Sequence, residues 1–447
     1  MKPQVAGASG AARVAVVGAG WAGLAAAVEA TQRGHEVALF EMAAQLGGRA
    51  RRVDIQAGDA TWELDNGQHI LIGAYQETLR LMRLVGADPQ QAFLRTPLRL
   101  VGPDGLGLSL PPGAPVLAFA RGVLGQRGWA LTDRLRLLAH AGGWMVGGFR
   151  CDSAITVAQL TAALPACIRQ DLIDPLCVAA LNTPATEASA TVFLRVLRDA
   201  LFSGPGSADL LLPKWRLSEL LPEPAAAWLW AAGARIELST RVTQIEPDGA
   251  AWKVNGQAFD HVVLATPPAE ASRLTAALQP AWAQAAAALR YEPIVTVYAQ
   301  SPGTRLPEPM LLLKSDETQN PAQFVFDLGQ LGGPEGLLAL VVSGAAPWVE
   351  RGAEFTTAAS LLQAQDALQA CLKSPLRVVK HLTEKRATFR CTPALARPSG
   401  LIAPGLFAAG DYVEGPYPAS LEGAVRSGLA AARRNLTSKT VLPAVRR

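Results

Sequence analysis

The segment from Arg13 to Glu41 carries glycines at a spacing that suits a bound dinucleotide. Gly18, Gly20 and Gly23 form a GxGxxG pattern between an apolar run at 14–17 and a helix-like run of small residues. The first glycine permits a tight turn, the second lets a pyrophosphate approach the backbone, and the third lets the helix pack closely on the strand. Free N–H groups at the helix start attract phosphates. The pattern therefore predicts a dinucleotide site.

Glu41 narrows the choice of nucleotide. It lies 18 residues after Gly23, at the end of a second predicted strand that reads "HEVALF". An acid at this position accepts a hydrogen bond from a ribose 2′-hydroxyl and repels a 2′-phosphate, so an FAD-like or NAD-like nucleotide is predicted, not NADP. A GxGxxG alone is weak, but a strand before it, a helix after it and the acid together are specific.

The residues after Glu41 favour FAD over NAD. Gly47, Gly48 and Arg49 form a glycine turn with an arginine, at a point where many NAD enzymes continue into another crossover helix. A guanidinium fork suits a pyrophosphate, and the alternative is a basic surface turn. Residues 53–73 then alternate like a β-hairpin.

A second pattern lies near the other end of the chain. An apolar run of strand length precedes Gly410 and Asp411, and apolar residues then recur with helical spacing. These apolar residues are Leu421, Ala424, Val425, Gly428, Leu429 and Ala432. A helix N-terminus carries roughly half a positive charge, so this helix would stabilise an anion at its start.

These motifs resemble those of the FAD-dependent amine oxidase and carotenoid-desaturase superfamily, over nearly the full length of the chain. The matching stretches are the acid followed by "xxxxLGGR", "LDNGQHI" at 64–70 and "AAGDYVEGPYPASLEGAVRSG" at 408–428. The resemblance implies contacts to FAD from Gly18, Gly20 and Gly23 (pyrophosphate), Glu41 (adenosine ribose), Gly48 and Arg49 (pyrophosphate or flavin side), the backbone of Val242 (adenine), Gly410 and Asp411 (ribityl–pyrophosphate link), and Ala419 and Ser420 (flavin N1–C2=O edge). Cys391 lacks the flanking glycines of members that tether flavin, so non-covalent FAD is expected.

The resemblance also implies the fold. The chain is expected to be α/β, α+β overall, with a Rossmann-like FAD-binding domain of the amine oxidase and glutathione-reductase type. The second domain would be a discontinuous substrate domain of helices and a mixed sheet. The FAD domain is expected from 1–75, 205–280 and 385–447, and the substrate domain from 76–204 and 281–384.

Composition bounds the class of protein. The chain has 447 residues, 50% of them hydrophobic and 17% charged, enough for two or three domains with a large core. The net charge of +4 is mild and the basic residues are scattered, so no nucleic-acid partner is predicted. Five cysteines without CxxC and five isolated histidines indicate neither a disulfide framework nor a metal site, and favour a cytoplasmic location.

Membrane contact is a separate question. No uncharged run reaches the ~18 residues that a spanning helix needs. In the region 105–149, however, Leu, Val, Phe and Trp are interleaved with arginines. This region is a candidate for lying on a membrane surface, and the alternative is an ordinary helical stretch that faces the core.

Longer stretches resemble a particular branch of the superfamily, the bacterial hydroxysqualene dehydroxylases. They lie at 65–86, 175–201, 209–229 and 384–398. The resemblance implies a hydrophobic C30 isoprenoid alcohol as substrate and squalene as product, upstream of hopanoids or C30 carotenoids. Replacing an allylic hydroxyl by hydrogen needs a hydride from reduced flavin and a proton for the departing water.

Four residues are candidates for the catalytic roles. Tyr417, His69 and Asp65 could donate the proton, and Asn182 could hydrogen-bond the substrate hydroxyl. Each has a structural alternative, such as a flavin lid for Tyr417 and a helix end before a proline for Asn182. The sequence does not identify the electron donor, since no second GxGxxG follows.

Two other functions stay open at this level. An oxidative isoprenoid desaturase or an amine oxidase would use the same FAD motifs with electrons flowing the other way. A Rab-binding escort or dissociation inhibitor has a similar fold and does not use FAD. The intact set of Glu41, Arg49 and Asp411 argues against the second of these alternatives.

Overall fold

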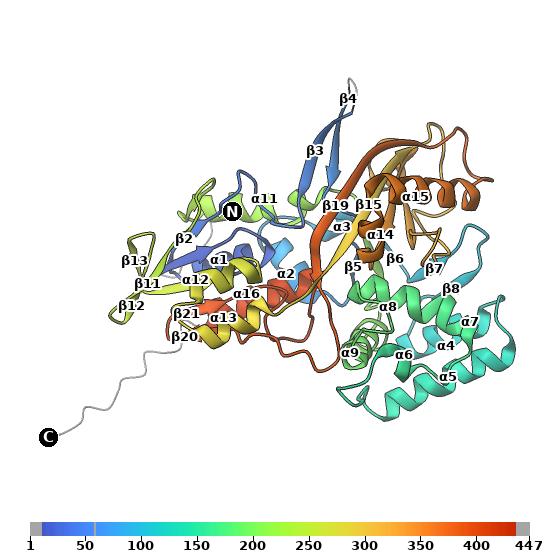
Figure 1. Cartoon of the computed structure of the whole chain (residues 1–447), viewed down its shortest axis with the longest axis horizontal. Coiled ribbons are helices and arrows are strands. Elements are labelled where there is room, and N and C mark those ends of the chain that lie inside the picture. The colour runs from blue at the N-terminus through green and yellow to red at the C-terminus, as the bar shows by residue number, and fades with distance from the viewer. Residues whose placement is uncertain (1–10, 58–59, 435–447) are drawn as a thin grey trace.

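The computed structural model describes residues 11–57 and 60–434, and it places the nucleotide motif in a six-stranded sheet (Figure 1). The strand order is β10-β2-β1-β14-β21-β20. The first five strands are parallel, and β20 runs antiparallel to β21. The strands are β1 (Arg13–Val17), β2 (Glu36–Phe40), β10 (Arg235–Glu237), β14 (His261–Leu264), β20 (Leu401–Ala403) and β21 (Leu406–Ala408).

Apolar layers cover both faces of this sheet, so its central strands are apolar on both sides. Val14 and Val16 face one layer, whereas Ala15 and Val17 face the other, as the period of two requires. The first layer contains α1 (Trp21–Gln32), α2 (Gln76–Leu84), α11 (Pro222–Ala231) and α16 (Leu421–Arg434). The second contains a three-stranded sheet, β11 (Ile245–Asp248), β12 (Ala251–Val254) and β13 (Gln257–Phe259), with α12 (Pro268–Thr275) and α13 (Pro280–Ala287).

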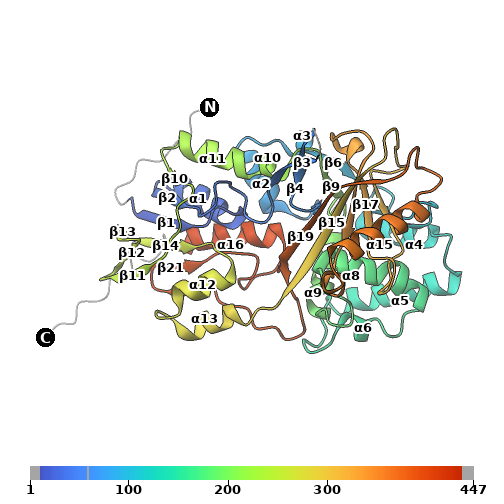
Figure 2. The same ribbon diagram turned by 45° about the horizontal axis from the view of Figure 1, so that its top comes forward.

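A five-stranded sheet of order β16-β17-β18-β15-β19 forms the core of the other half of the molecule. Its strands are β15 (Tyr291–Gln300), β16 (Met310–Leu312), β17 (Phe324–Asp327), β18 (Leu337–Val342) and β19 (Arg377–Phe389). Every pair of neighbouring strands in it is antiparallel, so the mixed sheet expected for the substrate domain is instead an antiparallel one. The sheet with both parallel and antiparallel pairs is the six-stranded sheet. Figure 2 shows the long strands β15 and β19 running from the nucleotide half into this half.

Helices cover both faces of the five-stranded sheet. One face packs against α14 (Ala346–Arg351) and α15 (Ala353–Ala367). The other packs against a helical layer that includes α4 (Pro115–Gly125), α5 (Leu131–Val146), α8 (Asp174–Leu181) and α9 (Ala190–Leu201). None of the helices within the described residues is long and apolar enough to cross a bilayer.

Short elements connect these layers. They are the hairpin β3 (Arg52–Ala57) and β4 (Ala60–Asp65), β5 (Leu71–Ile72), β6 (Phe93–Thr96), β7 (Arg99–Val101), β8 (Gly107–Ser109), β9 (Leu210–Pro213), α3 (Pro89–Ala92), α6 (Val157–Leu160), α7 (Ala166–Ile168), a π-helical turn (Arg169–Ile173), α10 (Leu217–Leu220) and a 3-10 turn (Leu328–Leu331). The hairpin is the one that the alternating pattern after Glu41 predicts.

All six strands of the nucleotide sheet come from the ranges expected for the FAD domain, 1–75, 205–280 and 385–447. Helix α2 lies outside those ranges, yet it packs in the same apolar layer as α1 and α16. The exact division of the chain into two domains stays a prediction.

Candidate functional site

The glycine pattern forms the turn between β1 and α1. Gly18 has a φ of +103°, and a Cβ on it would lie 2.6 Å from the carbonyl oxygen of Ala265. A Cβ on Gly23 would collide with the carbonyl oxygen of Gly18. Both positions therefore require glycine, one for its conformation and one for close packing.

A second glycine turn lies directly against the first. The Gly47 amide donates to the Ala19 carbonyl at 2.9 Å. A Cβ on Gly48 would lie 3.2 Å from the Cα of Gly20. Gly20 is the N-cap of α1, and it supplies no side-chain cap to the first turn. The structure thus brings the predicted pyrophosphate residues together beside a helix start without a side-chain cap, which suits an anion.

Glu41 follows β2 and contacts the glycine turn. Its Oε2 accepts from the Ala19 amide at 2.7 Å, and its Oε1 accepts from the Ala43 amide at 2.8 Å. Each carboxylate oxygen has a further lone pair that can accept a hydroxyl. The ribose contact of Glu41 stays a prediction, and its position at the carboxyl end of β2 is consistent with it.

Arg49 and Asp411 are 362 residues apart in sequence and form an ion pair. Nη2 of Arg49 lies 2.6 Å from Oδ1 of Asp411, and Nη1 donates to the Ala387 carbonyl at 2.6 Å. Asp411 is 8% exposed. The Gly410 amide donates to Oγ of Ser427 at 2.8 Å. The two ends of the chain thus meet at the predicted cofactor residues.

The start of α16 is tied to the same place. The Ala419 amide donates to the Asp411 carbonyl at 3.1 Å, and Ala419 has a φ of +55°. Oγ of Ser420 accepts from the Gly423 amide at 3.1 Å and so caps the helix, which begins at Leu421. Asp411 and the positive end of α16 are therefore neighbours, as the sequence predicts.

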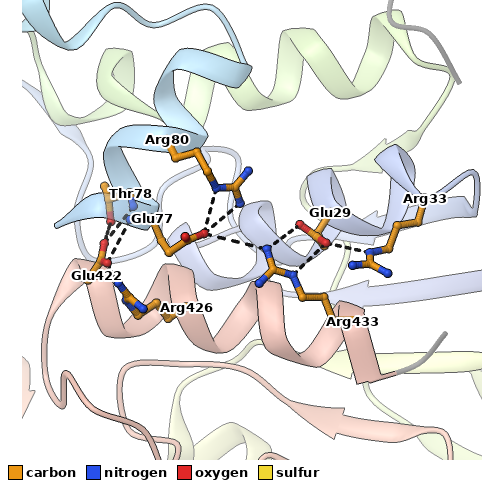
Figure 3. Close-up of polar contacts among 8 residues, drawn as sticks. All are labelled: Glu29, Arg33, Glu77, Thr78, Arg80, Glu422, Arg426 and Arg433. Carbon is orange, nitrogen blue, oxygen red and sulfur yellow. Dashed lines mark hydrogen bonds and ion pairs between the residues drawn. The ribbon is translucent and has the colours of Figure 1, made fainter. Parts of the chain in front are cut away.

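A network of charges holds α16 against α1 and α2 (Figure 3). The carboxylate of Glu422 is fully buried and accepts from the Thr78 amide at 2.9 Å and from Oγ1 of Thr78 at 2.7 Å. It also accepts from Nε of Arg426 at 2.6 Å. Near the other end of α16, Nε of Arg433 lies 3.0 Å from Oε1 of Glu29 on α1. The carboxylate of Glu422 thus caps the first turn of α2.

Tyr417 lies beside this helix start. Its ring is 5.0 Å from the Arg426 guanidinium and 5.8 Å from that of Arg195. Burial, and then the adjacent Asp199 carboxylate, raise the pKa of the Tyr417 hydroxyl. Tyr417 and Asp411 line one pocket of about 300 Å³.

Asp65 and Asn182 bind protein groups. Oδ1 of Asp65 accepts from the Leu217 amide at 2.9 Å, and burial raises the pKa of Asp65 to about 7. Nδ2 of Asn182 donates to the Glu292 carbonyl at 3.2 Å and to Oγ1 of Thr388 at 3.0 Å. Both side chains join separate segments of the chain, so the geometry supports the structural alternative for each.

His69 and Val242 occupy buried surroundings. Nδ1 of His69 lies 3.0 Å from the Gly67 carbonyl oxygen, and burial lowers its pKa, with the Arg49 charge adding to the effect. Val242 is 3% exposed and belongs to the second apolar layer of the nucleotide sheet. The proposed contact of the Val242 backbone with adenine stays a prediction.

Three buried hydroxyls that the sequence analysis missed also lie at the site. Tyr291 and Tyr412 are close enough to Arg49 and Asp411 for those charges to act on their pKa values, which burial raises. Thr266 is next in sequence to Ala265, whose carbonyl oxygen lies against Gly18. Among the described residues, none of these three hydroxyls has a hydrogen-bond partner. Unpartnered buried hydroxyls are costly, so they fit a site built for a polar ligand.

The chain is similar in sequence to known flavoproteins. The family model described as flavin containing amine oxidoreductase matches residues 21–436. A hydroxysqualene dehydroxylase of Rhodopseudomonas palustris is 28% identical over 94% of this chain and 97% of its own length. A hydroxysqualene dehydroxylase of Zymomonas mobilis is 27% identical over 93% of this chain and 97% of its own length. A zeta-carotene desaturase of Arabidopsis thaliana is 30% identical over 28% of this chain and 21% of its own.

Solved structures share the fold at low sequence identity. An oxidoreductase of Methanosarcina mazei has a TM-score of 0.69 at 16% identity, covering 94% of this chain and all of its own. A reduced UDP-galactopyranose mutase has a TM-score of 0.66 at 16% identity, covering 95% of this chain and 93% of its own. The extent of the family match, the fold and the meeting of the motifs lead to one conclusion: the chain belongs to the flavin containing amine oxidoreductases.

Proposed function

We propose that this chain is an FAD-dependent enzyme that reduces hydroxysqualene to squalene by replacing the allylic hydroxyl with hydrogen. The observation that carries the proposal is the match to hydroxysqualene dehydroxylases over 93–94% of the chain. The match to the zeta-carotene desaturase of Arabidopsis thaliana extends over only 28% of the chain. The desaturase alternative therefore has less support.

The residues at the site fit FAD held without a covalent bond. The proposed contacts are Gly18, Gly20, Gly23, Glu41, Gly48, Arg49, Val242, Gly410, Asp411, Ala419 and Ser420. The uncapped start of α1 and the three unpartnered hydroxyls support this assignment. Burial raises the pKa of the Cys391 thiol to about 12, so this thiol stays protonated and is a poor nucleophile toward a flavin.

Bound reduced flavin would supply a hydride to the allylic carbon, and the departing hydroxyl needs one proton to leave as water. We propose Tyr417 as the proton donor because it lines a pocket with Asp411 and a phenol carries its proton at neutral pH. His69 is less suited, since its lowered pKa leaves it neutral. Asp65 and Asn182 are engaged with protein groups.

The substrate is proposed to be a C30 isoprenoid alcohol. Such a molecule partitions into membranes, so we propose a cytoplasmic enzyme with peripheral membrane contact. The electron donor that reduces the flavin stays open among a separate reductase, a quinone and free reduced flavin.

Anaerobic single-turnover experiments test the proposal. The purified protein is loaded with FAD. One sample is reduced chemically and mixed with hydroxysqualene, and oxidised samples are mixed with squalene and with phytoene in parallel. We expect squalene by mass spectrometry, in step with the return of oxidised flavin absorption. Phytoene that loses hydrogen to oxidised enzyme, without squalene formation from hydroxysqualene, would establish the desaturase alternative.

The role of Tyr417 is tested with the same assay across pH. Tyr417→Phe should slow flavin oxidation about 100-fold or more and remove one limb of its pH dependence, with FAD content unchanged. A variant with an unaltered pH profile would exclude Tyr417 as the proton donor.

A further inference from the structure

Exposed apolar side chains are concentrated on one part of the helical layer. The described residues include fourteen large hydrophobic side chains that are exposed, and eight of them lie between Leu106 and Val146. They are Leu106, Val116, Leu117, Leu124, Leu131, Leu135, Met145 and Val146. Val146 is 93% exposed. So dense a group on a folded surface marks an interaction site.

Seven of these eight side chains lie on helices α4 and α5, whereas Leu106 precedes β8. The two helices pack against each other, and Phe119 of α4 and Leu137 of α5 enter the same core cluster. Their outer sides therefore face solvent at the end of the molecule away from the nucleotide sheet (Figure 1). On α5, Leu131, Leu135 and Val146 fall on one helical face. We call the six residues Val116, Leu117, Leu124, Leu131, Leu135 and Val146 the α4–α5 surface.

Exposed arginines lie on α4 and α5 and in the segments that follow each of them. Arg121, Arg127, Arg136 and Arg150 are exposed, and none of them forms an ion pair within residues 11–57 and 60–434. Residues 105–150 contain five arginines and one aspartate, so the rest of the chain holds 36 basic and 36 acidic residues. The net charge of +4 thus resides in this segment.

We propose that the α4–α5 surface docks the protein on an anionic phospholipid bilayer. Its leucines and valines would enter the boundary between headgroups and acyl chains, and the arginines would lie at the level of the phosphates. A second copy of the chain is a poorer occupant, because a two-fold contact would bring the same unpaired arginines face to face. The inference rests on the peripheral membrane contact of the proposed function and deepens it by naming the surface and the lipid charge. The vesicle assay contains no substrate, so its failure is distinguishable from a failure of the proposed reaction.

Vesicle flotation of the full-length protein tests the docking. The vesicles contain phosphatidylcholine alone or equal parts of phosphatidylcholine and phosphatidylglycerol. Binding to the anionic vesicles should be at least about tenfold tighter and should weaken as salt is added, because each arginine near the surface adds to the attraction. A protein that stays in the unbound fraction with both vesicles would overturn the proposal.

Matched variants locate the surface. The triple change Leu131→Ser, Leu135→Ser, Val146→Ser should weaken binding to the anionic vesicles at least about tenfold. The control Leu362→Ser, Val378→Ser, Leu401→Ser alters three exposed apolar residues elsewhere and should bind like the original protein. If the two triple variants lose vesicle binding to the same extent, the assignment to the α4–α5 surface is wrong.

A second pair of variants, at arginines, tests the proposal even if the triple variants do not fold. Arg121→Ala with Arg136→Ala should reduce the preference for anionic vesicles, whereas Arg377→Ala, an exposed arginine on β19, should not. Light scattering completes the set. A dimer that the Leu131, Leu135 and Val146 triple converts to a monomer, with vesicle binding unchanged, would assign the surface to a second copy instead.

Discussion

The contact between α1 and α16 leads to a quantitative prediction at Gly428. This glycine lies where α16 crosses α1, and a Cβ on it would come within 3.0 Å of the backbone carbonyl of Ala22, closer than side chains ever approach. The same Cβ would lie 3.1 Å from the Cβ of Ala25. Backbone atoms cannot rotate away, so Gly428→Ala requires one helix to move.

The structure sets the size of the effect. Relieving the overlap needs a shift of roughly 1 Å, and a gap of that size forfeits a quarter to a half of the dispersion energy of the contacts it opens. Overpacking of this kind costs about 1–3 kcal/mol. Because the nearest obstacle is the backbone carbonyl of Ala22, we expect the upper end, about 3 kcal/mol. FAD affinity should fall as well, since α1 and α16 carry the proposed pyrophosphate and flavin contacts.

The assay is urea unfolding followed by tryptophan fluorescence, with the ratio of FAD to protein measured on each purified variant. Gly143→Ala is the matched control, because Gly143 lies within α5 and a Cβ added to it would meet no atom within 4 Å. That substitution should stabilise the protein by about 0.5–1 kcal/mol, as alanine does in a helix. If Gly428→Ala unfolds at the same urea concentration as the original protein, the packing argument is wrong.

Three further predictions concern charge and the cofactor. Burial raises the pKa of Asp65 from 3.8 to about 7, so its contribution to stability is complete below pH 4 and is lost as the pH rises through 7. Above pH 7, the free energy of unfolding of the Asp65→Asn variant should therefore exceed that of the original protein by up to about 4 kcal/mol, and at pH 4 by much less. If urea unfolding gives parallel curves of stability against pH for the two proteins, the prediction is wrong. Asp411→Asn removes the charge that pairs with Arg49 and should weaken FAD binding about 10–100-fold in equilibrium titrations, while Asp248→Asn, which breaks the exposed pair with Lys253, should leave it unchanged. Acid denaturation should release all flavin into the filtrate, because the Cys391 thiol is buried and protonated, and a flavin mass retained on the chain would show covalent attachment.

Local patterns predicted the parts of the site that short segments form. The turn at Gly18 and Gly23 and the strand that ends before Glu41 lie within one βαβ motif, and their glycine positions follow from conformation and packing. The hairpin of β3 and β4 is equally local. Such elements can be predicted because the residues that determine them are neighbours in the sequence.

Long-range contacts explain what the sequence analysis missed. The stretch "ALNTP" at 180–184 predicts a helix end at Asn182. The amide of Asn182 also reaches β15 and β19, 110 and 206 residues later, and these hydrogen bonds could not be foreseen from the sequence. Tyr291 opens a strand that carries no motif, and only the folded chain brings it to Asp411. Glu422 did leave a signal, because it stands at helical spacing from Val425 and Leu429 and so places an acid on the apolar face of α16.

The order of the strands in the nucleotide sheet constrains the synthesis of the protein. β14 lies between β1, which is made early, and β21, which ends at Ala408. At about 5–20 residues per second, β21 follows β14 from the ribosome by roughly 7–30 s. Throughout that interval one edge of β14 has no partner strand, and Asp411 and α16 do not yet exist. Binding of the cofactor at the complete proposed site therefore waits until α16 has been made, and during those roughly 7–30 s the open edge of β14 can pair with another chain.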